Sequence, residues 1–555
     1  MTILKTLLVV LLSFCCCTSI LALMILLYGM FFPLSYNARL IGFVIKAFMY
    51  RRSKLNASVA NSLNGGEFRL DAPPLQEISF LQTFTGISDY VEYILSIDTH
   101  ITIRDGSLIS FNMGNFYQYC FFRFIFSTYR ISNHRFTSES NYEDQYKLWN
   151  LTPYNNPIET NFRTPDGLIK LLEMSIFSPL ILKTIIVPDG TKIFRIDMTI
   201  LESCEVKPGY EKLGGLVDFA IKEGNLQLVS CKCFETWTNG IESSTMKILS
   251  KEDLSNHERK EHIMQTIHTS IFTLQSIPYH GSIVHLNVTE SLLVANNLYL
   301  SVDNPIRKLL RCIEHESLKL IEVASLILLS RKGLEIVSNF TADGCRQAIS
   351  PSCVDISDHE WLISEPEESL SDVFKYTQQA RIWYHTIENF VRKYLKVNMY
   401  DNNKFSEDEN KWYKELSWTQ GELGYEKLIK VCTQALYTNV FHETMSYNDL
   451  ILNPLDGIST SIKKLPKDDF ETIPMGDIIN DCHQQIRAHS IATSTKINGY
   501  SIMHLDIYNI GNMEEKSLLC LKDFCSELRR LNTEWGNNGD YKLLLPSTVE
   551  FSPCF

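Results

Sequence analysis

Two histidines that are five residues apart, His280 and His285, are the side chains of this chain best suited to hold a metal ion. On a regular α-helix, positions five residues apart diverge by about 140°. One extra residue in a turn, a π-bulge, brings them together, and such bulges often occur at functional sites. Gly281, beside the first histidine, makes this distortion easier. The spacing therefore predicts a distorted helix with two imidazole ligands, although two structural histidines in a protein core would show the same pattern.

A second pair, His257 and His262, has the same spacing in a different setting. All the residues between them are charged, which is typical of a solvated helix face. Around His280 and His285 no charged residue occurs before Glu290. The contrast indicates that His280 and His285 form the buried site.

The composition is that of a globular chain. Its 555 residues are 45% hydrophobic and 21% charged, enough for a large core and for several domains. The net charge of −12 argues against nucleic acid as the main partner. The sequence contains no P-loop, no dinucleotide-binding glycine pattern and no nucleophile elbow, and its 15 cysteines form no pair of CxxC knuckles. These observations disfavour the corresponding nucleotide-binding, serine-hydrolase and zinc-finger classes.

The first 35 residues are strongly apolar. No residue from Leu7 to Pro33 is charged, and a helix needs about 20 apolar residues to span a membrane. The apolar stretch is longer than that of an ordinary cleaved signal peptide, and no clear Ala-x-Ala site follows it. We therefore predict a transmembrane or signal-anchor helix at residues 1–35.

A basic juxtamembrane segment follows at residues 36–55. It carries five basic side chains, whereas only Lys5 precedes the apolar stretch. By the positive-inside rule the rest of the protein faces the cytoplasm. Four glycosylation sequons, at Asn56, Asn150, Asn287 and Asn339, leave a secreted or luminal location as the alternative. The sequon at Asn287 falls in an expected core helix and is expected to be accidental.

The remaining elements predict a mainly α fold with a small β subdomain. Strand-like runs between residues 181 and 234 flank two turn sequences, Pro188–Thr191 and Glu223–Asn225, which predict antiparallel hairpins. From about residue 256 the chain is typical of long helices. They are expected at 262–285, with a kink at Pro278, and at 305–330, 372–399 and 428–442. The acidic run Ser406–Asn410 is expected to be a solvated turn and helix start.

Taken together, these segments resemble the lipoxygenases, the non-haem metal dioxygenases of polyunsaturated fatty acids. The pair His280 and His285 resembles their first metal-ligand helix. Other segments look like the stretch after that helix, a later helix pair and the strand that enters the catalytic domain: Asp303–Leu310, Arg381–Val391 with Trp412–Leu416, and Ile193–Asp197. The resemblance implies a lipoxygenase-like catalytic domain at 161–555, after a divergent N-terminal region at 56–160.

The resemblance also implies the remaining site residues. His442 looks like the third histidine ligand, and Ser446, one helical turn on, takes a fourth position for which Asn448 competes. The last ligand in the family is the main-chain carboxylate of the terminal residue, here Phe555. Ala324 occupies the position where Ala accompanies S products and Gly accompanies R products, although a small residue there could equally serve helix packing.

This ligand set suits one non-haem iron, or manganese, with an open coordination position. In the family, a metal(III)-hydroxide removes hydrogen from a 1,4-cis,cis-diene, and O2 adds to the carbon radical to give a hydroperoxide. The resemblance implies no catalytic group beyond that hydroxide. The expected partners are a polyunsaturated fatty acid, O2 and a membrane, and the protein is expected to be a monomer.

Four departures from the family pattern keep two alternatives open. Asn304 replaces the usual histidine, Glu290 stands where relatives often carry a non-ligand histidine, Ser446 is a poorer donor than Asn, and Phe555 replaces Ile or Val. One alternative is a catalytically degenerate, membrane-anchored relative that binds lipid or a protein partner. The other is a structural helical membrane protein whose histidines are core residues.

Overall fold

The computed structural model describes residues 165–174, 177–238, 241–314, 338–349, 365–371, 373–374, 376–416, 418–451, 461–464, 501–508, 512–537, 544–547 and 549. All of them belong to one compact unit. The predicted anchor at 1–35, the basic segment at 36–55 and the region at 56–160 lie outside the described residues. Among the helices in the described ranges, none combines the length and the apolar character needed to cross a membrane.

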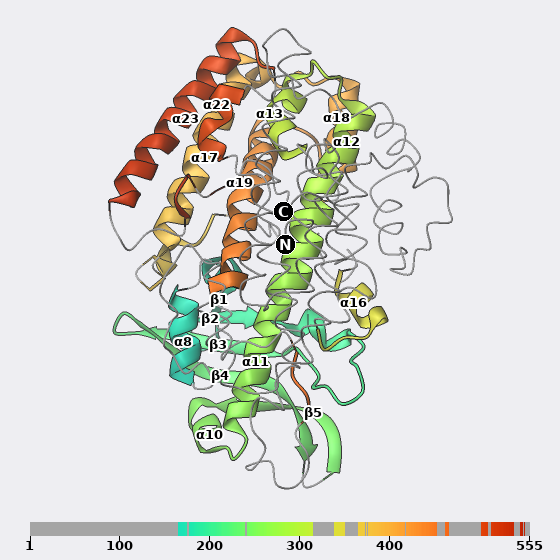
Figure 1. The fold of residues 1–555 in the computed structure, drawn as a ribbon, viewed down its shortest axis with the longest axis vertical. Coiled ribbons are helices and arrows are strands. Elements are labelled where there is room, and N and C mark those ends of the chain that lie inside the picture. The colour runs from blue at the N-terminus through green and yellow to red at the C-terminus, as the bar shows by residue number, and fades with distance from the viewer. Residues whose placement is uncertain are drawn as a thin grey trace, which may run out of the picture. The chain divides into compact units, whose positions relative to one another are not determined.

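One antiparallel sheet contains five strands in sequence order (Figure 1): β1 Leu182–Ile186, β2 Lys192–Asp197, β3 Leu216–Lys222, β4 Asn225–Thr238 and β5 Ile241–Ser250. Both predicted hairpins are confirmed. Between β3 and β4, Glu223 and Gly224 adopt left-handed backbone angles (φ 54° and 76°), as a tight hairpin turn requires. Gly215 precedes β3 with a φ of +104°, and a Cβ there would lie 1.9 Å from the carbonyl oxygen of Lys232, so only glycine fits.

A long continuous helical stretch carries the predicted histidine pair. It consists of α11 Lys260–Leu274, the π-helix η4 Gln275–Glu290 and α12 Ser291–Tyr299, which follow one another without a gap. Pro278 lies inside η4, where its missing N–H removes one helical hydrogen bond and favours an irregular pitch. The predicted π distortion is confirmed, and it extends over several turns rather than one bulge.

Five further helices make up most of the remaining helical part that the structure describes. They are α13 Pro305–Glu314, α17 Thr377–Val397, α18 Glu407–Glu415, α19 Tyr425–Ile451 and α23 Glu515–Gly536. The helix predicted at 305–330 is described only to Glu314. Shorter helical segments are α8 Pro165–Met174, α9 Ser178–Ile181, η3 Thr199–Ser203, α10 Lys251–Asn256, α16 Ala342–Ile349, η6 Glu368–Leu370, η7 Tyr400–Asn402, η9 Ile502–His504 and α22 Leu505–Tyr508.

Helices α17 and α19 form the centre of the helical part. Tyr437 on α19 donates a hydrogen bond to the carbonyl of Ala380 on α17 (3.2 Å). Toward the other end of α17, Arg392 forms an ion pair with Glu426 (2.9 Å). The order of these contacts makes the two helices antiparallel. Helix α19 also packs against η4, and Figure 1 shows α19 beside the continuous stretch that runs from α11 to α12.

Helix α18 begins where the acidic run predicts, but one acidic residue is buried. Ser406 is the N-cap, with a reciprocal capping box to Glu409. Glu409 is only 6% exposed, and its carboxylate also accepts hydrogen bonds from Tyr400 (2.6 Å) and Asn304 (2.9 Å). The prediction of a solvated segment is therefore wrong for Glu409, because distant donors compensate for its burial.

Candidate metal centre

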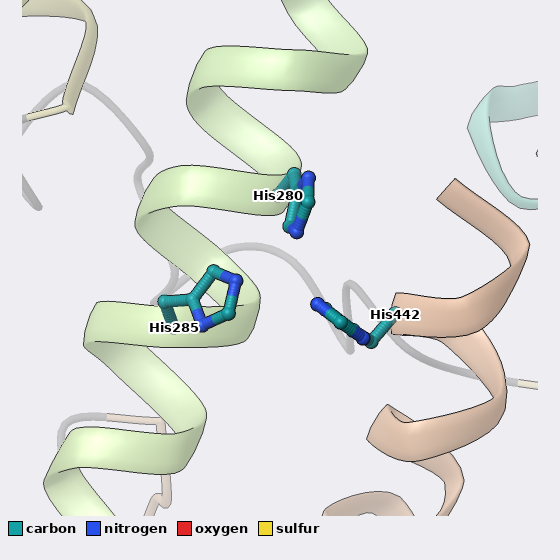
Figure 2. Close-up of side chains that lie close together, drawn as sticks. All are labelled: His280, His285 and His442. Carbon is teal, nitrogen blue, oxygen red and sulfur yellow. The ribbon is translucent and has the colours of Figure 1, made fainter. Parts of the chain in front are cut away.

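Three imidazoles converge between η4 and α19. His280 and His285 come from η4 and His442 from α19, and Figure 2 shows the three rings turned toward one another. The ring centroids are 4.9 Å apart for His280–His285, 4.9 Å for His280–His442 and 5.1 Å for His285–His442. One nitrogen from each ring lies within 4.8 Å of the other two. The structure thus brings the three predicted histidines to one point.

Burial keeps the rings of His280 and His285 neutral. His285 and His442 are 4% and 5% exposed, and burial lowers the pKa of His280 to about 4. The pKa of His285 is also well below its ordinary value, first because of burial and then because His280 would repel its charged form. Metal binding requires neutral imidazole. These two histidines are therefore in the metal-binding protonation state near pH 7.

The donor set fits a first-row transition metal. Imidazole nitrogen binds zinc at about 2.0–2.1 Å, so two nitrogens on one such ion lie at most about 4.2 Å apart. The observed separations, up to 4.8 Å, exceed that value, so the three rings would have to draw closer together to share one ion. Imidazole is a good ligand for iron, copper, nickel and zinc, so the three rings alone do not select one metal.

Side chains around His285 hold the π-helical geometry. The Thr289 hydroxyl donates to the carbonyl of Val284, five residues earlier (2.7 Å), so this side-chain bond spans the same five residues as the backbone bonds of a π-helix. Ser282 donates to the carbonyl of Ile349 at the end of α16 (2.8 Å) and accepts from the amide of Asn287 (3.1 Å). These contacts tie the ligand helix to a neighbouring element.

The sequence did not reveal this role of Ser282 and Asn287. Their only signal was the presence of polar side chains in an otherwise apolar run. In the sequence, Asn287 stands out only as a glycosylation sequon; it is 1% exposed, in agreement with the expectation that this sequon is accidental. The sequon at Asn339 is buried as well, and its amide donates to the carbonyl of Glu211 (2.6 Å).

The other predicted site residues are only partly placed. Ser446 and Asn448 lie on α19 after His442, but their side chains lie outside the described part of the structure, as do Ala324 and Phe555. The segment that leads toward Phe555 is anchored. Leu544 accepts a hydrogen bond from the indole of Trp383 (2.9 Å), and Val549 accepts one from the backbone N–H of Ile502 (2.9 Å).

The second histidine pair is not a solvated face, and that prediction is wrong in part. His262 is 8% exposed on α11, and its Nε2 lies 3.0 Å from Oε1 of the buried Glu211. His257 instead follows the last residue of α10. The charged residues between them made the stretch look exposed, but the acidic partner of His262 comes from a distant loop. The pair does not converge on one point.

Asn304, one of the departures from the family pattern, has a clear structural role. Its side-chain oxygen accepts from the backbone N–H of Ile306 (2.8 Å), which caps α13 at Pro305. Its amide donates to Glu409 (2.9 Å). An asparagine can make both contacts because it offers an acceptor and a donor together.

No protein-family model and no curated protein matches the sequence. Solved structures do match. A crystal structure of a lipoxygenase variant is 13% identical, with a TM-score of 0.62 over 80% of this chain and 75% of that one. A second lipoxygenase variant, crystallised anaerobically in complex with arachidonate, is 15% identical, with a TM-score of 0.58 over 78% and 73% of the two chains.

Further lipoxygenase structures match as well. The enzyme from Fusarium graminearum is 14% identical, with a TM-score of 0.55 over 76% of this chain and 77% of that one. A manganese lipoxygenase is 10% identical, with a TM-score of 0.52 over 72% and 75% of the two chains. The described residues therefore have a lipoxygenase-like fold: a mostly helical body with a small antiparallel sheet.

Proposed function

We propose that this protein is a dioxygenase of polyunsaturated fatty acids. In the proposed reaction, the C–H bond at the carbon between two cis double bonds is broken, and O2 is incorporated to give a hydroperoxide. The observation that carries the proposal is the convergence of His280, His285 and His442 within a lipoxygenase-like fold. One iron or manganese ion is the proposed cofactor, because a manganese lipoxygenase is among the similar structures.

In this proposal each histidine has a simple task. When bound, the metal would supply the one-electron oxidation that removes a hydrogen atom from the substrate. The three neutral imidazoles would hold the ion without cancelling its charge, and the burial of His285 and His442 limits the access of bulk water to reactive intermediates. We propose that Ser446, or Asn448 in its place, and the terminal carboxylate of Phe555 complete the ligand set. Ala324 is proposed to influence which face of the substrate reacts with O2.

The substrate class is proposed from chemistry and from one similar structure. The complex with arachidonate concerns another lipoxygenase, and we extend it to this chain as a proposal. Removal of a hydrogen atom between two double bonds requires a polyunsaturated acyl chain. Such a chain needs an apolar site, as lipid ligands generally do.

The domain plan and the location are proposals of their own. We propose that residues 161–555 form the catalytic domain and act as a monomer, and that residues 1–35 attach it to a membrane with this domain in the cytoplasm. The uncharged stretch from Leu7 to Pro33 and the basic residues after it support the attachment. Membrane fractionation of the full chain and of a chain lacking residues 1–35 tests it: only the full chain should stay with membranes after alkaline extraction.

The activity is tested directly with linoleate and arachidonate. Metal-loaded protein should consume O2 and raise the conjugated-diene absorbance, and mass spectrometry should find one hydroperoxide per product molecule. His285→Ala protein, prepared in parallel, should do neither. Metal uptake without diene formation would favour the degenerate lipid-binding relative. A protein with neither property would fit the structural alternative.

A further inference from the structure

Three aromatic rings pack together, and two of them belong to residues that directly precede proposed metal ligands in the sequence. Phe177 meets Tyr279 edge to face, with ring centroids 5.3 Å apart, and meets Phe441 in the same way at 5.9 Å. Tyr279 and Phe441 complete the triangle at 6.4 Å. Edge-to-face contacts at these separations are a favourable geometry for aromatic rings. We call these three residues the aromatic wedge.

Each ring of the aromatic wedge comes from a different element. Tyr279 directly precedes His280 on η4, and Phe441 directly precedes His442 on α19. Phe177 belongs to neither helix: it is the N-cap residue of α9, and β1 begins a few residues later. The one outside residue of the wedge therefore contacts the immediate neighbours of two proposed metal ligands.

We propose that Phe177 is a positioning residue that sets the separation between His280 and His442 by packing against Tyr279 and Phe441. This inference deepens, and rests on, the proposed metal-binding function. Phe177 and Phe441 are both 1% exposed, and close-packed interiors transmit small displacements. A change of ring size at position 177 is therefore passed to the backbone on both sides of the centre.

His285 is placed differently: its preceding residue is Val284, which lies outside the wedge. Disturbance of Phe177 should therefore affect the His280–His442 pair most.

Metal affinity provides the main test. Phe177→Ala and a control, Phe219→Ala, are titrated with Mn2+ or Fe2+ in competition with a chelator. Phe219 is fully buried on β3, so the control removes the same side chain from the sheet. We expect about a 10–100-fold loss of affinity for Phe177→Ala, as for other residues that orient metal ligands, and a much smaller loss for the control. Equal losses would overturn the proposal.

A double substitution separates positioning from general destabilisation. Because Phe177 packs against both Tyr279 and Phe441, the Phe177→Ala/Phe441→Ala protein should lose less affinity than the product of the two single losses. Losses that multiply would mean that the two rings act independently, which contradicts the wedge. Phe177→Leu, which keeps most of the apolar volume, should give a smaller loss in the same direction and serves if the alanine variant does not fold.

A structural measurement distinguishes failure of this inference from failure of the proposed function. Metal-free crystals of the Phe177→Ala and Phe219→Ala proteins would show whether the His280–His442 centroid separation, 4.9 Å here, has changed. The proposal expects a clear increase only in Phe177→Ala, and an unchanged separation overturns it. If the unaltered protein takes up no metal, the proposed function fails, and this comparison still decides the role of Phe177.

Discussion

The rings of His280 and His285 lie with their centroids 4.9 Å apart and their planes inclined by 31°, although the two residues are five positions apart in one helix. On a regular α-helix these side chains would diverge by about 140°. The π-helical pitch of η4 removes that divergence. The irregular helix therefore places both imidazoles on the same side of η4. Substitution of the residues that hydrogen-bond to this helix tests how it is held in that form.

Ser282→Ala should loosen this helix. The hydroxyl of Ser282 bonds both Ile349 and Asn287 in the buried interior, so its removal leaves two polar groups without that contact. We expect a loss of about 1–3 kcal/mol in the free energy of unfolding, together with weaker metal retention. Ser255→Ala, at an exposed serine of α10 that bonds its own helix, is the control. Urea unfolding of both proteins measures the difference, and equal effects would contradict the assigned role.

Glu409→Gln should change how stability depends on pH. Burial by itself would raise the pKa of Glu409, but hydrogen bonds from Tyr400, Ser406 and Asn304 outweigh it and lower the pKa. The carboxylate therefore contributes stability that is fully present above the ordinary glutamate pKa of about 4.3. That contribution is lost as the pH falls through the lowered value. At pH 7 the variant should be less stable by about 1–3 kcal/mol.

The difference between Glu409→Gln and the unaltered protein should shrink as the solution is acidified. Denaturant unfolding at several pH values between neutral and acidic measures it. Asp408→Asn, on the exposed side of the same helix, is the control and should leave the acid dependence nearly unchanged. A difference that stays constant with pH would contradict the role of the charged carboxylate.

Substitutions of Asn304 should separate its two contacts. Asn304→Ala loses both the cap of α13 and the donor to Glu409, and we expect it to lower stability by about 1–2 kcal/mol. Asn304→Ser retains a capping oxygen and should be milder. Asn304→Asp also retains the cap but places a second carboxylate beside Glu409. Its melting temperature at neutral pH should therefore be lower than that of Asn304→Ser. The order of melting temperatures checks this. Equal melting temperatures of Asn304→Asp and Asn304→Ser would argue against the contact with Glu409.

Extension of the chain beyond Phe555 should impair the metal centre. The segment before Phe555 is held by hydrogen bonds from Trp383 and from the backbone of Ile502. A C-terminal tag would have to displace this anchored segment and would remove the proposed carboxylate ligand. The same tag on the N-terminus is the control. Metal content of the two purified proteins is the measurement, and full occupancy with the C-terminal tag would exclude Phe555 as a ligand.

Local sequence signals were sufficient for much of the fold. Turn residues predicted both hairpins, and Pro278 with Gly281 predicted the distorted helix. Apolar periodicity predicted α17 and α19, although α19 extends at both ends beyond the predicted 428–442, to Tyr425–Ile451. Strand β5, Ile241–Ser250, was missed because its serine- and threonine-rich sequence has little alternation, and its strand form depends on pairing with β4.

Local sequence patterns could not reveal the contacts between segments that are far apart in the sequence. His262 and Glu409 sit among charged neighbours, so they looked exposed, whereas each is buried against a partner far away in the sequence. In the same way, spacing alone predicted His280 and His285, but His442 came only from the family resemblance. A ligand on another helix leaves no periodic signal beside the first two.

Metal stoichiometry tests the central claim, a three-histidine metal centre between η4 and α19, most directly. Purified protein reconstituted anaerobically with Fe2+ or Mn2+, then freed of loose metal, should hold about one ion per chain by elemental analysis. His442→Ala should retain almost none, whereas His385→Ala, a half-exposed histidine paired with Glu365 on the surface of α17, should match the unaltered protein. An unaltered protein without metal, or a His442→Ala protein with a full complement, would contradict the account.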